Sequence, residues 1–237
     1  MAGPRLTIDI ITLFPKLLEA SLDESMAKQA KKRGRVQIRI HNLRDYALDK
    51  RGTCDDKPFG GGAGMVMMIQ PIFDCLRKIG KKGWRVLVSP RGKVFNQSIA
   101  ARLARKKHLI FICGHYEGMD ERVHEHLVDE EVSLGDFVTT GGEFPALCFV
   151  DAVIRLVPGV LGNQNSLASE SFANGLLDFP QYTRPRDFSG WRVPEVLYSG
   201  NHHAVESWRK EKVQSITKKF RPDLILKNKK GFLETSK

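Results

Sequence analysis

Several classes of protein are excluded by what the sequence lacks. No apolar run approaches the roughly 18–20 residues that a membrane span requires, and Met1–Thr12 lack the basic, apolar and small-residue order of a signal peptide. The cysteines are few and far apart, without a C-x-x-C pair, which argues against a disulfide scaffold or a structural zinc site: Cys54, Cys75, Cys113 and Cys148. We therefore expect a soluble cytoplasmic protein with reduced thiols, no membrane association and no metal site.

Two common nucleotide-binding motifs are also missing. The densest glycine stretch, Asp55–Gly64, reads DDKPFGGGAG. No Gly-Lys-Ser/Thr follows it, as a P-loop requires, and it is not the G-x-G-x-x-G of dinucleotide-binding folds. Its glycines allow a sharp bend and a close approach of the main chain to a phosphate or to another chain segment, and an ordinary turn explains them equally well.

What the sequence has in excess is positive charge, and this charge is concentrated at one end. The chain of 237 residues has 41% hydrophobic residues, enough for a buried core, and a formal net charge of +11. Residues 181–237 carry +7 of this charge, whereas the first 180 residues carry +4. A solvated basic helix face explains such clustering, and so does a surface that binds the phosphates of a nucleic acid.

Apolar runs alternate with helical patterns along the first two thirds of the chain. The runs predict strands at Leu6–Leu13, Val36–Ile40, Trp84–Ser89 and Leu109–Cys113. The helical patterns lie at Pro15–Lys31, Gln70–Ile79, Asn96–Lys106, Met119–Val128 and Phe144–Val157. This alternation predicts an α/β fold with a largely parallel sheet. Phe144–Val157 is apolar almost all round, which predicts a helix buried on most sides, including at a subunit interface.

The composition changes after Leu161. Residues 162–180 are rich in Asn, Ser, Gly and Ala, which is typical of a flexible linker. In the basic region that follows, Asn201–Phe220 has the pattern of an amphipathic helix with an apolar side of Val205, Trp208, Val213, Ile216 and Phe220. We therefore predict three parts, residues 1–161, 162–180 and 181–237.

Three predicted strand ends carry glycine-containing loops. Ser89–Gly92 ends one strand, Gly114–Gly118 ends another, and Ser133–Glu143 contains a third loop. In open α/β sheets ligands bind at the carboxyl ends of the strands. Each loop alone is explained as an ordinary β–α connection, but together they predict a main-chain site for a small polar ligand such as an adenine ring.

Two charged residues stand out beside these loops. Arg155 lies in the apolar Phe144–Val157 segment, where a guanidinium is costly without an acidic partner or a ligand. Glu170 lies in the polar 162–180 segment. A structural salt bridge explains the first equally well and a solvated acid the second, and spacing alone does not pair them.

Many short motifs, in one order over nearly the whole chain, resemble those of the bacterial tRNA (guanine-N1)-methyltransferases, the TrmD type of the SPOUT class. They are Leu13-Phe14-Pro15, Asp55–Gly62, Leu87–Pro90, Gly114–Gly118, Gly135-Asp136-Phe137, Gly141-Gly142-Glu143, Pro158–Gly162, Tyr182–Pro185 and Ser199–His202. The resemblance implies a SPOUT-type parallel sheet with a deep C-terminal trefoil knot, an exception to the usual rule against knots. It also implies a small all-helical domain that binds tRNA, and a homodimer.

The resemblance further implies that S-adenosyl-L-methionine binds in the knot. By position, the cofactor residues would be Leu87, Ser89, Pro90, Gly114, Tyr116, Glu117, Ser133, Leu134, Gly135, Asp136, Phe137, Val138, Thr139, Gly141, Gly142 and Pro145. The family also requires Mg²⁺ for activity, although the sequence has no metal-binding spacing.

The reaction implied is methylation of N1 of the guanosine immediately 3′ of the anticodon in tRNA. That nitrogen is a poor nucleophile until it is deprotonated. By resemblance Glu170 would be the general base, and Arg155 of the other subunit would stabilise the charge that develops on O6. Glu170 stands where the family has aspartate, and His115 where it has arginine. The alternatives are a SPOUT-class enzyme that acts on another RNA and an inactive, basic RNA-binding protein.

Overall fold

The structure, a computed structural model, describes residues 4–80, 82–162 and 169–226. The chain divides into two compact units, Met1–Gly162 and Asn163–Lys237. Of the predicted linker 162–180, residues 163–168 lie outside the described residues, and residues 169–180 belong to the second unit.

The first unit is built on a five-stranded sheet in which all neighbouring strands are parallel, in the order β2-β1-β6-β5-β7. The strands are β1 (Leu6–Thr12), β2 (Val36–Asn42), β5 (Trp84–Val94), β6 (His108–Cys113) and β7 (Glu130–Ser133). The predicted α/β fold with a parallel sheet is confirmed. The sequence analysis did not predict β7, which has only four residues and begins with two glutamates.

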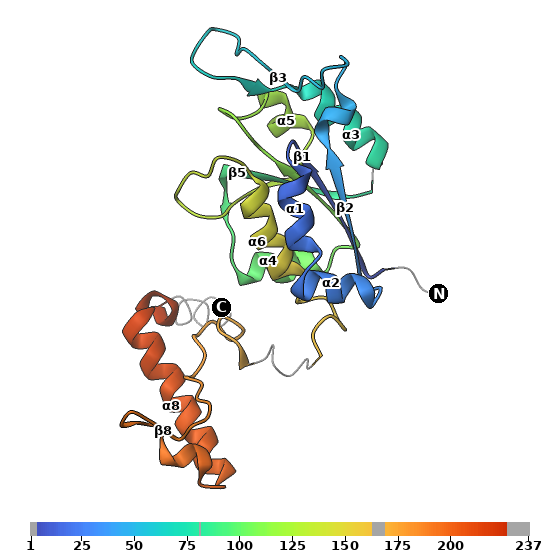
Figure 1. Cartoon of the computed structure of the whole chain (residues 1–237). Coiled ribbons are helices and arrows are strands. Elements are labelled where there is room, and N and C mark those ends of the chain that lie inside the picture. The colour runs from blue at the N-terminus through green and yellow to red at the C-terminus, as the bar shows by residue number, and fades with distance from the viewer. Residues whose placement is uncertain (1–3, 81, 163–168, 227–237) are drawn as a thin grey trace, which may run out of the picture. The chain divides into compact units, whose positions relative to one another are not determined.

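Helices cover both faces of this sheet (Figure 1). One face packs against α1 (Pro15–Leu22), α2 (Ser25–Lys32), α4 (Gln97–Ala104) and α6 (Glu143–Ile154). The other packs against α3 (Ile69–Ile79) and α5 (Glu121–His126). Strand β6 is apolar on both sides, because Phe111 belongs to the first core and Ile112 to the second.

The single helix predicted over Pro15–Lys31 is wrong, because the chain breaks there into α1 and α2. Ser25 has a φ of +48°, in the left-handed region, so a right-handed helix does not run through it. The Lys31 ammonium pairs with the Asp23 carboxylate beside the break. The two short helices both place buried residues, among them Leu18 and Ala30, in one core.

Small elements flank the glycine-rich stretch of the first unit. The 3₁₀ helix η1 (Leu43–Tyr46) follows β2, and β3 (Asp55–Asp56) pairs antiparallel with β4 (Val66–Met67). The intervening glycines Gly60, Gly61, Gly62 and Gly64 all have positive φ. The stretch is therefore a tight loop closed by a short ladder.

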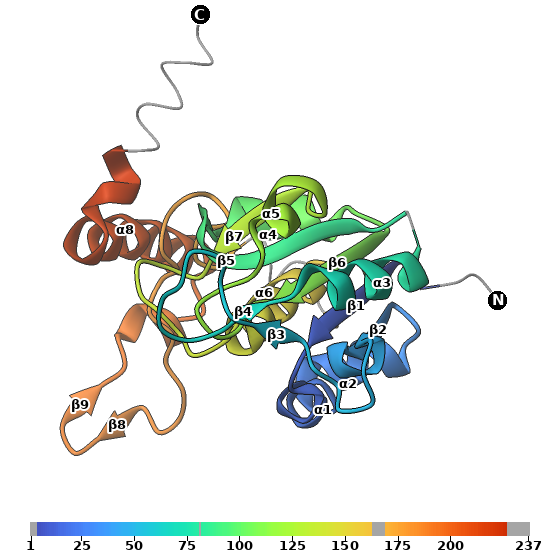
Figure 2. The same cartoon turned by 90° about the horizontal axis from the view of Figure 1, so that it is seen from above.

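The second unit combines helices with a β-hairpin, so the prediction that it is all-helical is wrong. Strands β8 (Asp187–Phe188) and β9 (Trp191–Arg192) pair through a turn (Figure 2). Ser189 and Gly190 both have positive φ, which matches the twist of a hairpin. The 3₁₀ helix η2 (Glu195–Tyr198) and the helix α8 (His202–Phe220) follow.

The helix predicted at Asn201–Phe220 is confirmed as α8. The side chain of Asn201 caps it by accepting a hydrogen bond from the Ala204 backbone N–H at 3.0 Å. Thr217 is buried and its hydroxyl accepts a hydrogen bond from the Leu177 backbone N–H at 3.0 Å, which ties the helix to the preceding segment.

The sequence also predicts that the chain has no membrane span and no disulfide. In the part of the chain that the structure describes, no helix is both long and apolar enough to cross a membrane. The four cysteines are free; Cys54, Cys75 and Cys113 are buried, whereas Cys148 is exposed.

Asp9 joins three strands from inside the sheet. Its side chain is fully buried, and its carboxylate accepts two hydrogen bonds from the Arg39 guanidinium, at 2.7 and 2.6 Å. His41 Nε2 and His108 Nε2 lie 2.6 and 2.5 Å from its oxygens. Burial by itself raises the pKa of Asp9, but the hydrogen bonds from His41, Arg39 and His108 outweigh it and hold the pKa well below its usual value.

Replacing this carboxylate by an amide in Asp9→Asn should lower the free energy of unfolding by about 3 kcal/mol, because it leaves the partners without their counter-charge. The pKa of Asp9 is lower in the folded than in the unfolded protein, where it is about 3.9. The stabilisation is therefore complete above pH 4 and is lost as the pH falls below that value. Urea unfolding followed by circular dichroism between pH 3 and 7 measures both effects.

The matched control is Asp23→Asn. Asp23 also has a lowered pKa, caused by the hydrogen bond from Lys31, but it lies on the surface. We expect no measurable change in its urea midpoint. Equal effects of the two substitutions would show that the buried network does not stabilise the sheet.

Candidate functional site

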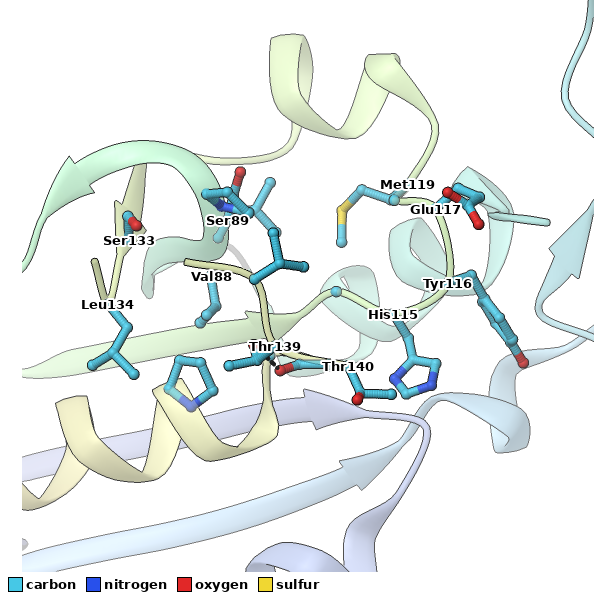
Figure 3. A pocket seen from close by; sticks show the side chains of 18 of the residues that line it. Val88, Ser89, His115, Tyr116, Glu117, Met119, Ser133, Leu134, Thr139 and Thr140 are labelled. Atoms are coloured by element: carbon cyan, nitrogen blue, oxygen red, sulfur yellow. Dashed lines mark hydrogen bonds between the residues drawn. The ribbon is translucent and has the colours of Figure 1, made fainter. Parts of the chain in front are cut away.

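A pocket lies at the carboxyl ends of β5, β6 and β7, as the glycine loops predict (Figure 3). Counted to its open mouth, the space has a volume of about 780 Å³. Of the residues predicted to bind the cofactor, all except Gly135 and Asp136 line it. Further lining residues that were not predicted are Val88, His115, Gly118, Met119, His124 and Thr140.

The first wall of the pocket is a bulge in β5. Val88 and Lys93 both pair with Val132 of β7, so the chain between them loops out of the sheet. A Cβ on Gly92 would lie 2.3 Å from the backbone nitrogen of Val132. The bulge therefore presses directly on the main chain of β7, and this contact requires glycine.

The second wall is the loop that follows β6. Tyr116 adopts a φ of +59°, which is uncommon for a residue other than glycine. The loop is held from behind, where Met67 N–H donates to the Gly118 carbonyl at 2.9 Å and Glu117 N–H to the Met65 carbonyl at 3.1 Å. The end of the glycine-rich stretch packs against this loop, since a Cβ on Gly64 would lie 2.5 Å from the Glu117 Cγ.

The third wall is the segment between β7 and α6. Gly142 N–H donates to the Gly114 carbonyl at 2.8 Å, and a Cβ on Gly142 would lie 2.9 Å from the Cys113 Cα. The Thr139 hydroxyl donates to the Gly141 carbonyl at 2.9 Å (Figure 3). The backbone of this segment therefore packs directly against the backbone at the end of β6.

Buried polar groups lie behind these walls. Glu143, the first residue of α6, is 2% exposed, and its Oε1 accepts a hydrogen bond from the Thr12 hydroxyl at 2.7 Å. Burial and then the Glu143 carboxylate raise the pKa of the Cys113 thiol well above its usual value. Tyr116, in the second wall, is 40% exposed, and partial burial followed by the effects of Asp55 raises the pKa of its hydroxyl. Both groups therefore stay protonated at neutral pH.

The two predicted catalytic residues belong to different units of the chain. Arg155 is half-buried and caps the C-terminal end of α6, rather than lying within the helix as predicted. Glu170 belongs to the second unit, where its carbonyl accepts a hydrogen bond from the Ala173 N–H at 3.1 Å. Their pairing stays a prediction.

The chemistry of the pocket suits a neutral, flat heterocycle. Its walls offer backbone N–H and C=O groups, and Leu87, Val88, Leu134 and Pro145 supply apolar surface. Glu117 adds a carboxylate at the loop after β6. Among the described residues, no group of three or more His, Cys, Asp or Glu side chains is arranged to hold a metal ion.

The unpredicted lining residues have simple origins. Val88 and His115 adjoin Ser89 and Gly114, which were predicted, so treating each loop as continuous main chain would have included them. His124 comes from α5, and only the packing of that helix beside β7 brings it to the pocket.

Known proteins resemble the chain over nearly its full length. The family model for "tRNA (Guanine-1)-methyltransferase TrmD" matches residues 6–227. A tRNA (guanine-N(1)-)-methyltransferase of Dictyoglomus turgidum is 52% identical over 94% of this chain and 91% of its own length. Proteins of the same name from Geotalea uraniireducens and Clostridium beijerinckii are 51% and 52% identical, over 92% and 93% of this chain and 89% and 92% of their own lengths.

The contact at Gly142 predicts that even one methyl group will damage the pocket. In Gly142→Ala the new Cβ meets the backbone of Cys113 and Gly114 at 2.9 Å, and neither can yield without moving β6. We expect a loss of at least about tenfold in the affinity for S-adenosyl-L-methionine, measured by calorimetry. Gly162→Ala is the control, since its Cβ meets nothing within 4 Å. Unchanged binding by Gly142→Ala would show that the contact between Gly142 and the end of β6 does not shape the pocket.

Proposed function

The chain belongs to the tRNA (guanine-1)-methyltransferase TrmD family, and we propose that it transfers a methyl group from S-adenosyl-L-methionine to N1 of the guanosine immediately 3′ of the anticodon in tRNA. The observation that carries the proposal is the main-chain pocket at the ends of β5, β6 and β7. The relatives are named for guanine N1 methylation, which supports the nucleobase and the atom.

The residues of this pocket fit the methyl donor. Close packing leaves no room for a Cβ at Gly141 or Gly142, which fixes the course of the main chain along this wall, and we propose that the backbone of the walls binds the edge of the adenine ring. Leu87 and Leu134 offer apolar contact to its faces. When bound, the donor supplies a methyl group on a sulfonium, which is electrophilic without help from the protein. The walls therefore have to bind and orient it rather than activate it.

The acceptor, by contrast, needs to be activated. Guanine N1 carries a proton at neutral pH, and we assign its removal to the Glu170 carboxylate, with an expected contribution of about 10²–10⁴-fold. As the proton leaves, negative charge develops on O6, and we assign its stabilisation to the Arg155 guanidinium. Both assignments rest on the positions of these residues in the family motifs. Mg²⁺ remains part of the proposal through the family alone.

We further propose a trefoil knot in the first unit and a homodimer in which each site takes Arg155 from one subunit and Glu170 from the other. The close packing of Gly142 on the end of β6 supports a threaded segment. Exposed apolar side chains on the α1 and α6 layer, Leu17 and Phe144, support a subunit contact there. Phe144 is 60% exposed, and the proposed subunit contact would bury it.

The second unit is proposed to grip the tRNA. Residues 181–237 carry a net charge of +7, and the β8–β9 hairpin exposes Phe188 and Trp191 beside Arg192. Positive charge binds phosphates, and exposed aromatic rings stack on unpaired bases. The alternatives, a SPOUT-class enzyme for another RNA and an inactive RNA-binding protein, would share this surface.

Methyl transfer to defined transcripts separates these functions. The protein is incubated with labelled S-adenosyl-L-methionine and with tRNA transcripts that differ only at the nucleotide 3′ of the anticodon. We expect label on the transcript with guanosine there and none on its adenosine counterpart. Label on both transcripts would favour a different target nucleoside, and label on neither would favour an inactive RNA-binding protein.

The shared site predicts rescue between two inactive variants. Glu170→Ala and Arg155→Ala should each reduce methyl transfer by about 10²-fold or more while donor binding is kept. Mixed dimers of the two variants contain one site with both residues intact, so mixing should restore part of the activity. Glu195→Ala, which removes an exposed carboxylate of the same unit, is the matched control and should be fully active. Absence of rescue would place the two residues in one subunit's site.

A further inference from the structure

His115 and Glu143 face each other behind the pocket. Their side chains are 18% and 3% exposed, and His115 Nδ1 lies 4.0 Å from Glu143 Oε2. Nδ1 is buried and has no hydrogen-bond partner among the described residues. The other carboxylate oxygen, Oε1, is already bound by the Thr12 hydroxyl. A buried nitrogen and a buried carboxylate oxygen are therefore opposed just beyond hydrogen-bond distance.

This pair spans two walls of the pocket. His115 belongs to the loop after β6, and Glu143 begins α6. Between them lies Gly141, whose backbone forms an isolated bridge with His115. A Cβ on Gly141 would lie 2.4 Å from Glu143 Oε2 and 2.5 Å from His115 Nδ1. Any attraction between the two side chains therefore draws the loop after β6 onto the segment that ends at Gly142.

Building on the function proposed above, we propose that Glu143 is a positioning residue for the methyl donor and that it acts through a proton bound by His115. The imidazole takes this proton from solvent, and the resulting cation donates from Nδ1 to Glu143 Oε2. Both buried atoms are then satisfied, and the two walls are held together around the donor. When the proton leaves, Oε2 faces an uncharged ring and the walls lose this attraction.

Histidine is the type of side chain that gains and loses a proton near neutral pH. Of the groups around the pair, the Cys113 thiol has a pKa raised by burial and by Glu143, and the Tyr116 hydroxyl has a pKa raised by burial and by Asp55. Both stay neutral between pH 5 and 8, whereas an ordinary imidazole changes its charge in that range. Phe14, which stacks on the His115 ring at 4.7 Å between centroids, carries no charge.

A second histidine of the pocket has a different partner. His124 Nδ1 lies 2.9 Å from Glu131 Oε1 of β7, and the residue comes from α5. It also lines the pocket, so the experiment has to separate the two rings.

The test is the affinity for the donor as a function of pH. Calorimetry with S-adenosyl-L-methionine and with S-adenosyl-L-homocysteine, between pH 5.5 and 8.5, measures it without any methyl transfer. We expect the affinity of the wild-type protein to fall about tenfold over this range, which corresponds to a shift of about one pKa unit in a single group on binding. Both probes should give the same slope, because the effect arises in the walls and not from the sulfonium charge.

Substitutions of these residues show which side chain binds the proton. His115→Arg carries a permanent charge and should bind the probes with little pH dependence, close to the low-pH affinity of the wild type. His115→Gln and Glu143→Gln should bind more weakly at low pH and also lose the slope. His126→Gln, which changes an exposed histidine outside the pocket, should keep the wild-type profile.

Each other outcome overturns the inference in a recognisable way. A slope that survives in His115→Gln but disappears in His124→Gln would assign the proton to the other ring. A slope seen with S-adenosyl-L-methionine alone would assign the effect to charge repulsion of the sulfonium. Absence of binding by either probe at any pH would instead contradict the proposed function, whereas pH-independent binding would leave that function intact and refute only the role of this pair.

Discussion

The close contact of main chain with main chain at the end of β6 is the constraint on which the pocket depends. At Gly142 a side chain would occupy the space of the Cys113 Cα, and at Gly92 it would occupy the backbone of β7. Because both contacts involve backbone rather than side-chain ends, no rotamer change relieves a larger residue. These contacts therefore fix the bulge of β5 against β7 and the start of α6 against the end of β6 before a ligand arrives.

The sheet below supports this arrangement in two ways. Its strands carry apolar residues on both faces, so helix layers hold it from each side, with Phe111 and Ile112 of β6 in different cores. At the far side from β7, the buried Asp9 ties β1 to β2 and β6 through Arg39, His41 and His108. β6, whose end contacts Gly142, is thus also tied to β1 and β2.

Much of the fold follows from periodicity, because the central strands are apolar runs with clear ends. Periodicity missed the break at Ser25, because its left-handed backbone has no signature in hydrophobicity. It also missed the short strand β7, in which Val132 is the one apolar residue. The site was predicted as three loops, since glycine marks places where backbone comes close. The arrival of His124 from α5 depends on tertiary packing, which local sequence does not encode.

A pocket built largely of backbone has a consequence for the chemistry. In the function proposed above, backbone groups bind the adenine edge, so we assign proton removal and charge stabilisation to side chains outside the lining of the pocket. Among the described lining residues Glu117 is the carboxylate, and it is packed against the glycine-rich loop at Gly64. A carboxylate held in that way suits binding of the donor. In the proposed reaction the acid that deprotonates the acceptor is Glu170 of the second unit, the part of the chain that also contains the basic region 181–237.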